Sequence, residues 1–158
     1  MSSEIIIRPA RADDLSAVLR LWQEAGVTPP SVTDLIEGLT RLIREPAALL
    51  LIAINDDRIV GSVIGGWDGW RGNIYRLAVT PQYRRKRIAR KLVEAVSDAL
   101  FAKGADRLSA LVEHEHQWAV DFWNSVRDLG YQHDPQFVRY IADRQEHDMK
   151  ITSNNRQD

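Results

Sequence analysis

Six positively charged side chains lie within eight residues near the middle of the chain, in the run RRKRIARK of residues 84–91. The whole chain has a formal net charge of −1, so with +6 in this run the other residues together carry −7. The apolar residues that follow have helical spacing, which places the run near the start of a helix. Cations are disfavoured there by the helix dipole, and a bound anion would remove the conflict.

The residues alone leave two interpretations of this basic run. In the first, Thr80 caps a helix that begins at Pro81, and the cations lie on a solvated second turn with partial compensation from a pair such as Arg90 and Glu94. In the second, TPQY is a turn and the chain forms a loop through residues 84–89 before the helix. Backbone N–H groups of that loop would then converge on an anion such as a phosphate, with arginines around it.

The stretch EHEH, residues 113–116, offers groups that could accept a proton. Glu113 and His116 are the candidates for a general base, directly or through water. The alternative is a polar strand end before a helix. Two histidines beside carboxylates also suggest zinc, but the spacing matches no strong metal-binding motif, so we expect no metal.

The loop GGWDGWRG, residues 65–72, contains candidates for substrate binding. Trp67 and Trp70 could stack on an amine substrate, with Asp68 beside them. The same tryptophans could instead form a lid or a dimer contact, and Asp68 could be only the turn residue before Gly69.

The surrounding pattern predicts the elements that must position these groups. Strand-like runs occupy residues 4–10, 48–54, 59–66, 73–79, 106–113 and 137–143. Asp13 can cap a first helix, whose apolar spacing continues up to Gly26. Helical spacing also runs from Ser31 to Pro46 and recurs over residues 84–103 and 117–130. The order predicts an α/β (α+β) fold with a mixed, mostly antiparallel sheet of about six strands and about four flanking helices.

Composition limits the functional classes. The 158 residues include no cysteine, and no apolar run approaches the roughly 18 residues of a membrane span. The start MSSEIIIRP lacks a basic leader. We expect a cytoplasmic protein with one domain over residues 1–143, a poorly ordered polar tail over residues 144–158, and no membrane partner. Because net charge is near zero, an anion site must be local.

The segment IYRLAVTPQYRRKRIARKLVEAV resembles the acetyl-CoA-binding segment of the GNAT superfamily of N-acetyltransferases. In that family a strand ending in Ala-Val is followed by Pro-x-Tyr-Arg, by Arg/Gln-x-x-Gly-x-Gly/Ala and by an amphipathic helix. Arg84, Ile88 and Ala89 match this pattern, and the predicted element order resembles the family fold over residues 4–142. Arg87 stands where the family has its first glycine, and Arg85 where glycine is common. Such side chains are tolerable if φ remains negative.

The resemblance implies acetyl-CoA as the acetyl-donor cosubstrate. The family's strand end hydrogen-bonds pantetheine, which implies roles here for Leu77, Ala78 and Val79. The amides of the next loop hold the pyrophosphate, and its basic side chains reach the phosphates. The residues implied are Arg84, Arg85, Lys86, Arg87, Ile88 and Ala89, with Arg90 close by. Coenzyme A carries about four negative charges, which suits a loop rich in cations.

Family analogy also assigns the remaining chemistry. The Val79 N–H is the expected hydrogen-bond donor to the carbonyl oxygen of the acetyl thioester, which gains negative charge during the reaction. Many members place a proton-donating Tyr on the late helix, but the corresponding stretch here is HQWAVDFW, with Trp123 at that position. An indole N–H is not a usable proton donor. Tyr131 is therefore the candidate acid, although its position is more often a core position in the family.

These features favour an N-acetyltransferase that acts on a primary amine of a small molecule or protein, in a ternary complex. An acyl-CoA-binding regulator with the same fold and little turnover is the alternative, because the usual Tyr is missing. A nucleic-acid-binding module is a third possibility, but the −7 outside the basic run and the lack of interleaved aromatics argue against it. The resemblance also allows a homodimer.

Overall fold

The computed structural model describes residues 3–27, 31–144, 148–149 and 152. Five strands form one sheet in the order β1-β2-β3-β4-β5. Neighbours are antiparallel from β1 to β4, and β5 is parallel to β4. The strands are β1 (Ile6–Pro9), β2 (Ala48–Asn55), β3 (Arg58–Trp67), β4 (Gly72–Val79) and β5 (Leu108–Ala110). The prediction of a mixed, mostly antiparallel sheet is confirmed, with one strand fewer than expected.

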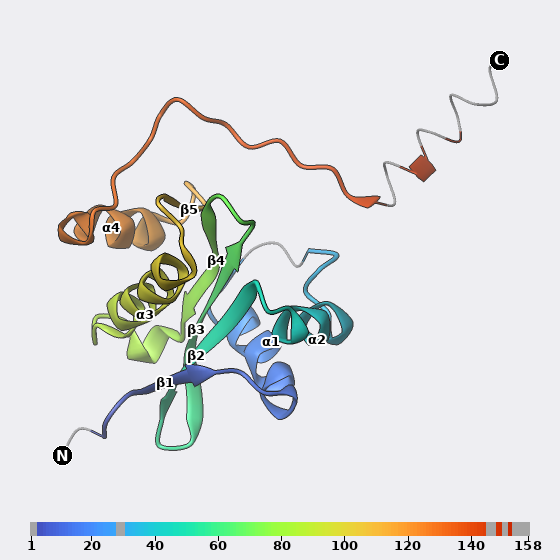
Figure 1. The fold of residues 1–158 in the computed structure, drawn as a ribbon. Coiled ribbons are helices and arrows are strands. Elements are labelled where there is room, and N and C mark those ends of the chain that lie inside the picture. The colour runs from blue at the N-terminus through green and yellow to red at the C-terminus, as the bar shows by residue number, and fades with distance from the viewer. Residues whose placement is uncertain (1–2, 28–30, 145–147, 150–151, 153–158) are drawn as a thin grey trace.

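Helices cover both faces of this sheet (Figure 1). They are α1 (Leu15–Glu24) and α2 (Ile36–Arg44) on one face, and α3 (Ile88–Lys103) and α4 (Gln117–Ser125) on the other. The interior strand β2 contributes side chains to both layers, because Leu50 and Ile52 belong to the core under α1 whereas Leu51 and Ala53 belong to the core under α3. A strand buried on both faces reads as a continuous apolar run, which explains the sequence ALLLIAI.

The starts of the first two helices differ from the sequence prediction. Asp14, not Asp13, anchors the first one. Its carboxylate accepts from the Arg11 N–H at 2.7 Å and from both terminal nitrogens of Arg8 at 2.7 and 3.1 Å. The second helix begins at Ile36 and not at Ser31, because residues 31–34 form a separate turn in which the Asp34 carboxylate accepts the Ser31 N–H at 3.0 Å.

Two glycines of β3 allow α3 to lie close against the sheet. A Cβ on Gly65 would lie 2.6 Å from Val96 Cγ2, and one on Gly61 would lie 3.1 Å from Ile88 Cγ2. Ile88 and Val96 are both buried. The close approach fixes the N-terminal end of α3 beside the end of β4.

The predicted strand over residues 137–143 is wrong. This segment has no strand structure and leaves the body of the protein (Figure 1), and Phe137 and Tyr140 are 73% and 92% exposed. A strand needs a hydrogen-bonded neighbour as well as a suitable pattern, and β5 offers only three residues instead of the eight predicted over residues 106–113. The predicted helix over residues 117–130 ends at Ser125, and a short 3₁₀ turn (Arg127–Leu129) leads to Gly130, whose φ is +93°.

Candidate functional site

The basic run forms a loop before the helix. Pro81–Tyr83 is a 3₁₀ turn, residues 84–87 are irregular, and α3 begins at Ile88. The interpretation in which the helix starts at Pro81 is therefore wrong, and the loop interpretation is correct for the backbone. The Arg90–Glu94 pair expected from the spacing does form, with Arg90 Nε 3.0 Å from Glu94 Oε1.

Six consecutive backbone amides of this loop and the helix start lack an internal acceptor. Among the described residues, none accepts a hydrogen bond from the N–H groups of residues 85–90, whereas the N–H of Lys91 bonds to Arg87 O at 3.1 Å. The first N–H groups of a helix have no intrahelical partner. Together with a left-handed residue just before the helix, such amides can form a concave anion-binding nest.

Two residues of the loop have a backbone conformation that favours glycine. The φ angles of Arg85 and Arg87 are +62° and +63°. The condition stated for a tolerable side chain, a negative φ, is therefore not met at either position. The family pattern has glycine at both places, so the chain keeps a glycine-like backbone while adding two cations. A left-handed conformation costs an L-residue about 1–2 kcal/mol.

The side chains of Arg85, Lys86 and Arg87 are exposed. Lys86 Nζ lies 4.9 Å from the centre of the Tyr83 ring. These three cations therefore surround the run of free amides without being buried. The loop combines main-chain donors with exposed positive charge, an arrangement that suits a phosphate-bearing ligand.

Arg84 has a different role in this structure. Its guanidinium donates to Ala25 O at 2.9 Å and to Val79 O at 3.3 Å, and it lies 4.4 Å from the centre of the Trp118 ring. Burial lowers the pKa of the Arg84 guanidinium below its ordinary value. The side chain thus joins the end of α1, the end of β4 and the first turn of α4. Only the main chain of Arg84 belongs to the loop surface.

Arg90 also forms ion pairs within the protein. Besides Glu94, its guanidinium donates to both carboxylate oxygens of Asp128. The hydrogen bond that Arg90 donates to Asp128 is the main cause that raises the pKa of Arg90. With two carboxylates bound, this side chain links α3 to the 3₁₀ turn at Arg127–Leu129 and adds no free cation to the loop.

A gap separates β4 from β5 beside this loop. The two strands pair from Gly72 to Ile74, and the last contact is Leu111 N–H to Ile74 O at 3.3 Å. Beyond it, β4 continues to Val79. Because the Thr80 N–H donates to Val60 O at 2.9 Å, the antiparallel alternation turns the N–H of Val79 away from β3 and toward the gap.

The same alternation places the other predicted strand residues. Leu77 and Val79 pack toward the core under α3, and Ala78 packs toward the core under α1. The N–H groups of Leu77 and Val79 therefore face the edge of β4 that β5 does not cover. The structure brings these backbone groups and the loop of residues 84–89 together at one end of β4.

Glu113 and His116 form a pair next to the gap. His116 Nε2 lies 2.8 Å from Glu113 Oε2, and His116 is the N-cap residue of α4. Trp118, in the first turn of α4, contacts Arg84, which in turn contacts the end of β4. The two proton-accepting candidates are thus one interacting unit, held on the side of the gap opposite β4.

Tyr131 is engaged with α3. Its hydroxyl lies 2.6 Å from Ser97 Oγ, and its ring meets the Trp123 ring edge to face with centroids 5.0 Å apart. Burial raises the pKa of Tyr131, and the hydrogen bond with Ser97 opposes that shift. These contacts are those of a packing residue between α3 and α4.

The loop of residues 65–72, which contains Trp67 and Trp70, lies at the other end of β4. Trp67 and Trp70 precede Gly72, whereas the basic loop follows Val79, so about 20–25 Å of strand separates them. Asp68 accepts the N–H groups of Trp70 and Arg71 at 2.8 and 2.7 Å, and these bonds lower its pKa. Asp68 is a turn residue here, and the loop is not brought together with the gap.

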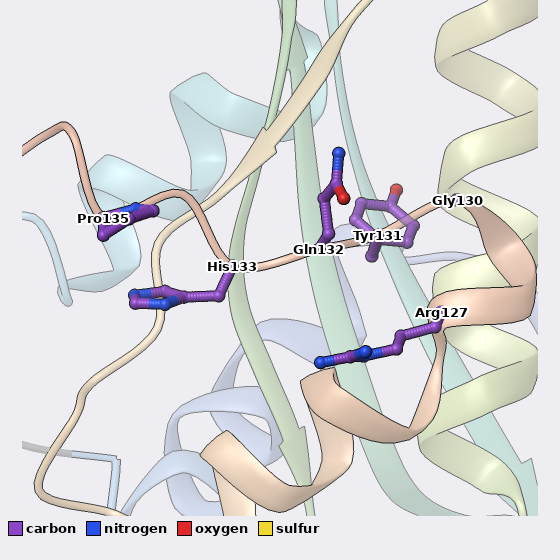
Figure 2. A pocket seen from close by; sticks show the side chains of 6 residues that line it. All are labelled: Arg127, Gly130, Tyr131, Gln132, His133 and Pro135. Carbon is purple, nitrogen blue, oxygen red and sulfur yellow. The ribbon is translucent and has the colours of Figure 1, made fainter.

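A pocket of about 550 Å³ lies beyond the 3₁₀ turn (Figure 2). Arg127 reaches alongside the backbone of the chain after Gly130, and the Tyr131 ring lies on the α3 side. The lining residues are Arg127, Gly130, Tyr131, Gln132, His133 and Pro135. None of them belongs to the basic loop or the gap, and Tyr131 is the lining residue that is also a candidate for the chemistry.

One feature of β4 was missed by sequence reasoning. Two residues, Arg76 and Leu77, stand opposite the single residue Val63 of β3, and Arg76 has a φ of +52°. Such a β-bulge turns successive side chains to the same face. Arg76 pairs with Asp34 at 2.7 Å and lies 5.4 Å from the Trp22 ring centre. The available signal was the pair Tyr75-Arg76, which breaks the alternation of the strand.

Within the part of the chain that the structure describes, none of the helices is both long enough and apolar enough to cross a membrane. The same residues contain no group of three or more His, Asp or Glu side chains that could hold a metal ion.

Comparison with known proteins gives a consistent result. The model of the acetyltransferase (GNAT) family matches residues 15–131. An acetyltransferase of Pectobacterium atrosepticum is 31% identical over 120 residues, which cover 76% of this chain and 84% of that protein. The chain is also similar to two crystal structures. The PaiA N-acetyltransferase from Thermoplasma acidophilum in complex with coenzyme A has a TM-score of 0.71 at 18% identity, covering 78% of this chain and 88% of that one.

The second is the aminoglycoside N-acetyltransferase AAC(6')-Iy in complex with CoA, with a TM-score of 0.71 at 18% identity, covering 90% of this chain and 97% of that one. At these identities the two structures support the fold, while the family match and the sequence relative extend over most of the chain. The chain therefore belongs to the GNAT family of acetyltransferases.

Proposed function

We propose that this protein is an N-acetyltransferase that moves the acetyl group of acetyl-CoA directly to a primary amine of a small molecule or protein while both are bound. Acetyl-CoA is the acetyl donor of the family. The observation that carries the proposal is the run of amides over residues 85–90 without an internal acceptor, at the end of a strand that has separated from its neighbour.

The loop fits the charged end of the donor. The free N–H groups of residues 85–90 and the exposed side chains of Arg85, Lys86 and Arg87 supply the donors and charge that a pyrophosphate needs. The N–H groups of Leu77 and Val79, which face the gap, would hold the pantetheine arm. The side chains of Arg84 and Arg90 are not part of this phosphate site, because both are bound within the protein.

The reaction forms a carbon–nitrogen bond to the amine and breaks the carbon–sulfur bond of the thioester. The Val79 N–H would stabilise the negative charge that develops on the carbonyl oxygen. The amine must lose a proton, and we propose that the Glu113–His116 pair accepts it. The thiolate that leaves takes up a proton, so the charges balance. Tyr131 is the candidate donor of that proton, although its contact with Ser97 favours a packing role.

Two similar proteins support an amine-type acceptor. AAC(6')-Iy is described as an aminoglycoside N-acetyltransferase and PaiA as an N-acetyltransferase. Both act at nitrogen, which supports a nitrogen acceptor here.

The test combines binding with turnover. Acetyl-CoA should raise the thermal unfolding midpoint, duplex DNA should not, and thiol should be released when a panel of primary amines is added. The variant Arg85→Gln with Lys86→Gln should raise KM for acetyl-CoA by about tenfold or more, since hydrogen bonds to charged groups contribute about 1.5–3 kcal/mol. Its matched control is Arg41→Gln with Arg44→Gln, two exposed cations of α2, which should leave KM unchanged.

A second function is favoured by one observation. Trp123, at the position where relatives place a catalytic Tyr, packs its ring against Tyr131. An acyl-CoA-binding regulator would need no proton donor there. Stabilisation by acetyl-CoA without thiol release from any amine would support this alternative and contradict the proposed enzyme.

A further inference from the structure

An exposed apolar surface lies on the face of the sheet that carries α1 and α2. We call it the acceptor face. It consists of Val32, Leu35, Ile36, Tyr75 and Leu111, which are 60%, 56%, 41%, 37% and 47% exposed. We propose that this face binds an aliphatic or aromatic group attached to the acceptor amine, so that the preferred acceptors are amphipathic monoamines. The inference rests on the proposed function, which it makes more specific.

Tyr75 and Leu111 lie side by side on this face. Ile74 and Ala110 are partners in the parallel register, and both pack toward the core under α3. The next residue of each chain points to the opposite face. Tyr75 is also the cross-strand partner of Ile64, which packs against the core under α1. The tyrosine and the leucine are therefore adjacent on the α1 side.

The ion pair of Arg76 and Asp34 connects Tyr75 and Leu111 with the rest of the acceptor face. The residues that it connects to them are Val32, Leu35 and Ile36. The bulge directs Arg76 to the same face as Tyr75, and its guanidinium lies 2.7 Å from the Asp34 carboxylate. Val32 lies two residues before Asp34, Leu35 follows it directly, and Ile36 begins α2. The turn of residues 31–35 is thus held against β4 next to Tyr75.

The acceptor face is continuous with the gap between β4 and β5. Leu111 makes the last backbone contact before the two strands separate, and Tyr75 is the first residue of β4 beyond the paired segment. Helix α1 packs on β3 and β4 and α2 packs on β2 (Figure 1), so Ser109 and Leu111 are left exposed. The basic loop and α3 bring the acetyl donor from the opposite face. An amine that enters from the acceptor face would meet the thioester in the gap.

Charge on this face selects against a second cation on the acceptor. The Asp34 carboxylate is already paired with Arg76 and also accepts the Ser31 N–H. Glu113 is paired with His116. These two carboxylates, the ones beside Arg76 and the gap, are therefore already engaged, and next to the gap apolar contact is the main source of binding energy.

The test uses acceptors of matched length. Thiol release is measured with butylamine, hexylamine and octylamine, and hexylamine is compared with hexanediamine, which adds only a second cation. Each methylene that becomes buried should raise kcat/KM by about three- to fourfold, which gives about tenfold between butylamine and hexylamine. Hexylamine should exceed hexanediamine by at least as much. Chain-length dependence is also measured as the shift of the thermal midpoint in the presence of CoA, which needs no turnover.

Two variants and one control locate the effect. Leu35→Asn should reduce the hexylamine-to-butylamine ratio below about threefold, and asparagine is a preferred N-cap residue at this position of α2, so folding should be preserved. Leu111→Asn should act in the same direction. Phe101→Asn, which changes a 50% exposed residue of α3, should leave the ratio unchanged.

The outcomes separate this inference from the proposed function. Turnover of hexanediamine equal to or above that of hexylamine, or a ratio that Leu35→Asn and Leu111→Asn do not change, would overturn the acceptor face while leaving the enzyme assignment intact. If no amine releases thiol, the enzyme assignment fails. The thermal shifts then decide the inference alone: shifts that do not grow with chain length overturn it.

Discussion

The guanidinium of Arg84 lies 4.4 Å from the centre of the Trp118 ring and is the contact that joins the basic loop to the first turn of α4. Two backbone carbonyls, those of Ala25 and Val79, complete its surroundings. A cation beside the last carbonyls of α1 also has a favourable interaction with the helix dipole. This arginine therefore has the contacts of a structural residue, although its sequence position belongs to the candidate binding loop.

We expect Arg84→Gln to lower the free energy of unfolding by about 2 kcal/mol, because partly buried carbonyl groups lose a charged donor. Arg85→Gln removes the same charge from an exposed neighbour and should change stability by less than about 0.5 kcal/mol. Urea denaturation measures both variants. Equal stability of the two would contradict the structural role of Arg84.

The left-handed conformation of Arg87 leads to a second prediction. At this position Gly should be more stable than Ala by about 1 kcal/mol, because φ is +63°. At Lys91, an exposed residue inside α3, Ala should be more stable than Gly by about the same amount. Urea denaturation measures whether the difference in free energy of unfolding between Gly and Ala has opposite signs at the two positions. The variants are Arg87→Gly, Arg87→Ala, Lys91→Gly and Lys91→Ala. Arg87→Gly should also weaken acetyl-CoA binding, since it removes a cation.

The fold could be predicted where local pattern and tertiary packing agree. The apolar run of β2, the hairpin after it and the periodicity of α3 are each specified by residues that end up buried. The strand over residues 137–143 could not be judged in the same way. Its alternation is suitable, but its existence depends on a partner strand, and β5 ends after three residues.

The site could be predicted at the level of the backbone and less well at the level of side chains. The motif located the loop and the strand end, because glycine-like turns and strand ends follow from local sequence. The partners of Arg84 and Arg90 lie far along the chain, at Ala25 and Asp128, and no spacing rule connects them. The Arg76–Asp34 pair could not be predicted for the same reason.

The pair of Glu113 and His116 should contribute to turnover more than to donor binding. We expect His116→Gln and Glu113→Gln each to lower kcat by at least about tenfold, since general base catalysis contributes about 10²–10⁴-fold. KM for acetyl-CoA should stay within about twofold. The neighbours His114 and Glu115 are exposed and provide matched controls, His114→Gln and Glu115→Gln, that should keep kcat.

Stability should depend on pH through Asp14. The Arg8 guanidinium, which donates to both oxygens of the carboxylate, is the main cause that holds the pKa of Asp14 below its ordinary value; burial opposes it and the Arg11 N–H adds to it. A carboxylate with a lowered pKa in the folded state stabilises the fold above its unfolded pKa, about 3.9. That contribution, roughly 1 kcal/mol for a pair of this kind, is lost as the pH falls through the lower, folded pKa.

Asp14→Asn should therefore be less stable than the unmodified protein at pH 7, and the difference should shrink as the pH falls below about 4. Asp13→Asn changes the exposed neighbour that spacing alone suggested as the helix cap, and its effect should be small at every pH. Urea denaturation at pH 7, 5, 4 and 3 measures both variants. If the two aspartates give equal effects at pH 7, Arg8 and Asp14 do not anchor the first helix; if the Asp14→Asn difference persists unchanged at pH 3, the stabilisation does not come from the ionised carboxylate.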